Sequence, residues 1–86
     1  MKPTKKDWFE VASICGEWIR GQAELNDPII WNYYRETLGS RVWNLYHKTM
    51  LEAAGIIDPI QPFNVTCEKR MFVALQIACE KAGLCR

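Results

Sequence analysis

His47, the only histidine of the chain, is the first residue to consider for chemistry at neutral pH. A histidine acts as a general base only when one neighbour orients it and a nucleophile or water lies beside it. On a helical projection His47 lies at the border of a polar face, near Asn44 and Lys48, and no Ser-His-Asp arrangement is present. We therefore expect a solvated surface histidine.

The cysteines are the second candidate group, because thiolates can bind zinc: Cys15, Cys67, Cys79 and Cys85. A zinc site needs closely spaced ligand pairs. Twelve positions on one helix separate Cys67 from Cys79 by roughly 18 Å. Cys79 and Cys85 could approach each other, but two ligands do not hold a metal. We expect no metal site, with Cys15, Cys67 and Cys79 in the core and Cys85 exposed.

The acidic residues offer no catalytic pair. Glu10, Glu17 and Glu24 recur every seven positions, which is the spacing of a solvated helix face. No glycine-rich phosphate loop is present. The sequence therefore predicts a protein that is not an enzyme and has no cofactor.

Length and composition limit the class of protein. Eighty-six residues, 49% hydrophobic and 24% charged, are typical of one globular domain spanning 1–86 and exclude a disordered tail. The formal net charge of +1 lacks the basic excess of a dedicated duplex-binding domain. The charged N-terminus resembles no export signal, and no run of about 20 apolar residues occurs. We expect a cytoplasmic protein with reduced thiols and no membrane contact.

Hydrophobic periodicity predicts the elements that position these residues. Thr4 and Asp7 form a capping pair before a helix over residues 5–25. The predicted core face of this helix consists of Trp8, Val11, Ala12, Cys15, Trp18, Ile19, Gln22 and Ala23.

Two shorter helices follow, over 28–38 and 41–54. Asn26-Asp27-Pro28 starts the first of them, whose wide apolar arc, which includes Trp31, implies burial on more than one side. Gly39-Ser40 separates the two, although a continuous helix over 28–54 is the alternative. Ala54-Gly55-Ile56 predicts a Schellman end, with Ile56 folded back on Leu51.

The last helix is predicted over 66–82, capped by Asn64 or Thr66, after an extended connector fixed by Pro59 and Pro62. Gly83-Leu84 repeats the glycine-based helix end. No stretch alternates at the period of a strand. The predicted fold is all-α, a single-domain four-helix bundle-like arrangement.

One surface of the last helix suggests a partner. Val73 and Ile77 lie one turn apart on the side that should be polar, framed by Lys69, Arg70 and Lys81. An apolar pair with a charged rim is typical of a helix-mediated protein contact. The alternative is that this helix packs on two sides.

The predicted function is binding of an unidentified protein partner, as an inhibitor or adaptor of the kind found among phage and mobile-element accessory proteins, with self-association into a homo-oligomer also open. The alternative is a helix-turn-helix-like domain in which helix 41–54 contacts nucleic acid. Its contact residues would be Arg41, Asn44, His47 and Lys48.

Overall fold

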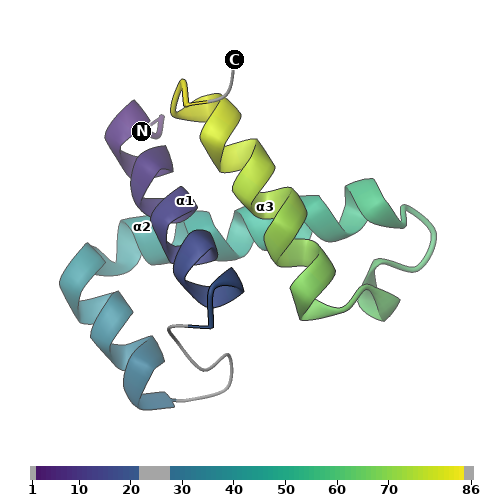
Figure 1. The fold of residues 1–86 in the computed structure, drawn as a ribbon, viewed down its shortest axis with the longest axis horizontal. Coiled ribbons are helices and arrows are strands. Elements are labelled where there is room, and N and C mark those ends of the chain that lie inside the picture. Colours follow the sequence, from purple (N-terminus) through teal and green to yellow (C-terminus); the bar gives the residue numbers. More distant parts are fainter. Residues whose placement is uncertain (1, 22–27, 85–86) are drawn as a thin grey trace.

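The computed structural model describes residues 2–21 and 28–84, and over these ranges the chain is all-α, as predicted (Figure 1). Its elements are α1 (Lys5–Ile19), α2 (Pro28–Ile57), the short 3-10 helix η1 (Pro62–Asn64) and α3 (Cys67–Lys81). The described part of the chain contains no strand. None of its helices is long and apolar enough to cross a membrane.

The helices form a crossed arrangement. α1 and α3 lie side by side with opposite chain directions, and the second half of α2 runs across both of them (Figure 1). Because each of these three elements packs on the other two, the core lies where they cross. The core cluster consists of Val11, Ala12, Ile14, Cys15, Trp18, Val42, Trp43, Tyr46, Ala53, Met71, Ala74 and Ala78.

α1 begins with the predicted capping box. The Asp7 N–H donates to Thr4 Oγ1 at 3.2 Å, and the Thr4 N–H donates to Asp7 Oδ2 at 2.9 Å. The predicted end at residue 25 is wrong: the helix ends at Ile19, because Gly21 adopts a left-handed φ of 73°. The rest of that prediction, residues 22–25 and the Asn26-Asp27 cap, lies outside the described residues.

α2 is broken at Gly39, where φ is 82° and ψ is 158°. A non-helical residue at this position separates a first half, 28–38, from a second half, 40–57. The two-helix prediction is therefore correct and the continuous helix is wrong, since only glycine readily adopts this backbone conformation.

The predicted helix end at Gly55 is wrong. Gly55 is helical, α2 continues to Ile57, and no left-handed residue occurs there. Leu51 and Ile56 are 66% and 64% exposed, so the predicted contact between them does not shield either side chain. The helix ends instead just before Pro59, whose ring disfavours helical backbone at the preceding residue.

The first half of α2 is less buried than its apolar arc implied. Ile29 and Tyr33 are 79% and 63% exposed, so burial on more than one side is not observed there. The Trp31 side chain lies outside the described residues. Tyr34 anchors this half: its hydroxyl donates to Glu17, and its ring lies 6.5 Å from the rings of both Trp18 and Trp43.

α3 has the predicted caps at both ends. Thr66 Oγ1 accepts from the Lys69 N–H at 3.3 Å. At the other end the Leu84 N–H donates to the Cys79 carbonyl at 2.8 Å and the Gly83 N–H to the Glu80 carbonyl at 3.1 Å. With Gly83 at a φ of 76°, this is a complete Schellman motif.

Candidate protein-contact surfaces

The two apolar residues predicted to contact a partner on α3 are not separate from the core. Val73 and Ile77 are half-buried and pack against the core cluster. α3 contacts both α1 and α2, and a helix with two packing partners needs an apolar arc wider than one stripe. The structure therefore agrees with the alternative interpretation, in which this helix packs on two sides.

Two of the three rim cations make contacts within the chain. The Arg70 guanidinium group donates to the carbonyl oxygens of Val65 at 3.0 Å and Pro62 at 3.1 Å. Lys81 Nζ lies 5.9 Å from the centre of the Trp8 ring, in a cation–π contact between α3 and α1. Lys69 is exposed. Arg70 and Lys81 therefore tie α3 to the rest of the chain as well as lining its surface.

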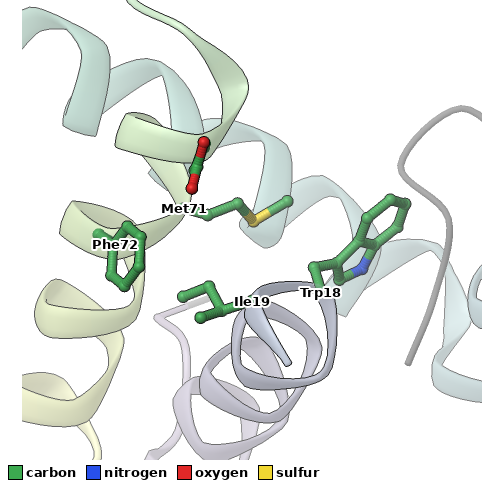
Figure 2. A pocket seen from close by; sticks show the side chains of 5 residues that line it. Trp18, Ile19, Met71 and Phe72 are labelled. Carbon is green, nitrogen blue, oxygen red and sulfur yellow. The ribbon is translucent and has the colours of Figure 1, made fainter. Parts of the chain in front are cut away.

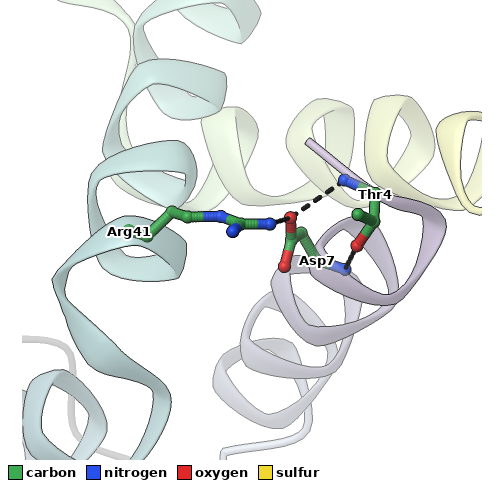
Figure 3. Close-up of polar contacts among 3 residues, drawn as sticks. All are labelled: Thr4, Asp7 and Arg41. Carbon is green, nitrogen blue, oxygen red and sulfur yellow. Dashed lines mark hydrogen bonds and ion pairs between the residues drawn. The ribbon is translucent and has the colours of Figure 1, made fainter. Parts of the chain in front are cut away.

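Arg41, a residue of the nucleic-acid alternative, is paired within the chain. Its guanidinium group reaches from α2 to the Asp7 carboxylate at the start of α1 (Figure 3). Hydrogen bonding from the Thr4 backbone N–H, and then the Arg41 guanidinium group, lower the pKa of Asp7 from its ordinary 3.8. Asp7 thus ties the first turn of α1 to α2 (Figure 3).

All four residues of that alternative are exposed on α2, and three of them line one hollow. Arg41, Asn44 and Lys48 line a shallow hollow of about 230 Å³ beside the N-terminus of α1. His47 is not part of it: its ring contacts Trp43 and Tyr46, with ring centres 4.9 and 5.1 Å apart. Partial burial lowers the pKa of His47, which favours the uncharged ring over a phosphate-binding cation.

A second hollow lies between α1 and α3. Trp18, Ile19, Met71 and Phe72 line it together with Glu68, around about 160 Å³ (Figure 2). The Trp18 indole N–H is buried and has no hydrogen-bond partner among the residues that the structure describes. The hollow is lined by four apolar side chains and by the Glu68 carboxylate. Glu68 is the one titratable side chain among these five residues, and the set contains no second group that would orient it for catalysis.

The cysteines match the sequence expectation only in part. Cys15 is buried, and burial raises the pKa of its thiol to about 12. Cys67, predicted in the core, is exposed, because it opens the first turn of α3. Cys79 is half-buried, and Cys85 lies outside the described residues. Over residues 2–21 and 28–84 no group of three metal-ligating side chains comes together.

Among the described residues, a highly exposed apolar surface lies on a stretch that the sequence predicted as a helix end followed by an extended connector. Ile56, Ile57, Ile60 and Phe63 are 64%, 37%, 88% and 89% exposed within eight consecutive positions. We call these four residues the apolar corner. They lie where α2 ends and the chain turns through η1 towards α3 (Figure 1).

The backbone beneath the apolar corner is held by several hydrogen bonds. An Asp58 carboxylate oxygen accepts from the N–H groups of Ile60 at 3.1 Å and Gln61 at 2.9 Å. The Arg70 contacts described above hold the other side of the turn. Two prolines, Pro59 and Pro62, restrict φ further. The exposed side chains are therefore presented from an ordered turn.

Comparison of the chain with protein-family models, with curated protein sequences and with solved structures finds no match in any of the three.

Proposed function

We propose that this chain is a non-enzymatic protein-binding module, an inhibitor or adaptor, that contacts protein through the apolar corner. The observation that carries the proposal is the exposure of Ile60 and Phe63, at 88% and 89%, on a hydrogen-bonded turn. Large apolar side chains left in water contribute nothing to the folding of a small domain, whereas burying them against a partner is favourable.

The ordered turn supports this choice of surface. Binding energy is reduced by the entropy lost when a flexible loop is immobilised. Asp58, Arg70 and the two prolines already restrict this turn, so less entropy is lost on binding. By contrast, Val73 and Ile77 on α3 already pack against the core. We therefore place the contact at the apolar corner rather than on α3.

The test is capture of proteins from the source cell by the immobilised chain, read by mass spectrometry. Three proteins are compared: wild type, Ile60→Glu and the matched control Ile29→Glu. Both substitutions add one negative charge at an exposed isoleucine, 88% and 79% exposed, and Ile29 lies on a different element, the first half of α2.

We expect Ile60→Glu to lose proteins that wild type and Ile29→Glu both retain, with circular dichroism unchanged in all three. Equal capture by all three proteins contradicts the proposal. Material that is captured only at low salt, and that nuclease treatment releases, would instead support the nucleic-acid alternative.

A further inference from the structure

We propose that the protein covering the apolar corner is a second copy of this chain, packed corner to corner in a two-fold homodimer. This inference rests on the proposed function, because it names the partner of the same surface. It follows from the charge, the area and the rigidity of the corner.

The charge of the corner permits contact with its own image. In a two-fold interface each residue meets the same surface on the other copy, so a patch rich in one charge would repel itself. Over residues 56–63 the only charged side chain is Asp58, and its carboxylate is bound to the backbone N–H groups of its own turn. The formal net charge of +1 adds little repulsion between whole chains.

The area of the corner suits a weak dimer. At roughly 150–200 Å² for a fully exposed side chain of this size, the exposed fractions of the four residues amount to about 400–550 Å². Two corners packed together would bury about 800–1,100 Å², which is near the lower limit of about 1,000 Å² for a specific interface. The neighbouring side chains of Pro59, Gln61 and Pro62 would add to it.

The rigidity of the corner makes so small an interface workable. A hydrogen-bonded turn loses little freedom on association, so most of the apolar burial contributes to affinity. We expect a dissociation constant on the order of 10–100 μM, typical of small reversible interfaces.

The experiment is sedimentation equilibrium of the purified full chain, from about 10 μM to about 1 mM so as to bracket that constant. Reductant is present throughout to keep the thiols from cross-linking. We expect the mass of wild type to rise from the monomer value of 10.0 kDa towards twice that value. Because each substitution enters a two-fold interface twice, Ile60→Glu should weaken the dimer by about a hundredfold or more. Ile29→Glu should dimerise like wild type.

A wild-type chain that stays monomeric at the highest concentration overturns the inference, as does an Ile60→Glu variant that dimerises like wild type. Phe63→Glu, at an equally exposed position of the corner, should weaken the dimer as well, so that the conclusion does not rest on one substitution. A monomeric wild type combined with corner-dependent capture of another protein would remove the dimer and leave the proposed function intact. If the chain dimerises through the corner and captures only copies of itself, the dimer stands and the inhibitor or adaptor role is contradicted.

Discussion

Asp7 shows how much one side chain can do in a domain of this size. It completes the capping box of α1 with Thr4 and also pairs with Arg41 of α2 (Figure 3). The local half of this role could be predicted from sequence, because a capping box is a spacing of three residues. The pairing with Arg41 could not, because it depends on how α1 and α2 cross.

The lowered pKa of Asp7 predicts a dependence of stability on acid. A carboxyl group whose pKa is lower in the folded than in the unfolded chain stabilises the fold when ionised. This stability is present above the ordinary pKa of 3.8 and is lost as pH falls through the folded value. Urea unfolding between pH 2 and 6 should show that the loss below about pH 4 is smaller in Asp7→Asn than in wild type. Identical pH profiles would contradict this role.

Gly55 and Gly83 show that the local sequence alone does not decide whether a glycine ends a helix. Both are followed by an apolar residue, and both were predicted to end a helix. Gly83 does so, with Leu84 bonded back to Cys79, whereas Gly55 stays helical. The difference lies in the residues that follow each glycine. After Gly55, the first residue that disfavours a helix is Pro59, so α2 can continue to Ile57.

Gly55→Ala should therefore stabilise the protein. A helical glycine costs about 0.5–1 kcal/mol relative to alanine, and an added Cβ at Gly55 would meet no atom within 4 Å. Urea unfolding should show a gain of that size. A loss of about 1 kcal/mol would mean that the residue ends the helix after all.

At the scale of elements, helix type and approximate span could be read from the sequence, but the packing partners of each helix could not. The predicted core face of α1 omitted Ile14, which is 1% exposed, and the polar side assigned to α3 carries half-buried Val73 and Ile77. Both errors have one cause. A helix between two others buries a wide arc, and a single sequence does not show how many neighbours a helix has.

The backbone conformation of Gly39 sets the direction of the first half of α2 relative to the second half. Alanine at a φ of 82° and a ψ of 158° is strained even though its Cβ would meet no atom within 4 Å. Gly39→Ala should cost about 1–3 kcal/mol through the backbone alone. Comparison with Gly55→Ala, the same substitution within a helix, isolates that conformational term. If Gly39→Ala leaves the free energy of unfolding unchanged or raises it, the break in α2 at this position does not require glycine.

At the scale of the whole molecule, 86 residues cannot bury all of their large apolar side chains. The sequence shows this excess in its 49% hydrophobic content, but it does not show where the excess lies. Exposure was predicted on α3, whereas the two most exposed large apolar side chains of the described residues, Ile60 and Phe63, lie in the apolar corner, on a turn that extends away from the region where the helices cross (Figure 1). Pro59 and Pro62 were interpreted as fixing an extended connector, and that prediction is wrong over Pro62–Asn64, where the chain forms the 3-10 helix η1.

The most direct test of self-association through the apolar corner is a dilution series followed by backbone amide NMR. Concentration-dependent shifts should be confined to amides over 56–63 and the adjoining turns, while those of Ile29 and Tyr33 stay constant. The Ile60→Glu variant should show no such shifts. Shifts centred on residues 69–81 of α3, or a wild-type spectrum that does not change up to about 1 mM, would contradict self-association through the corner.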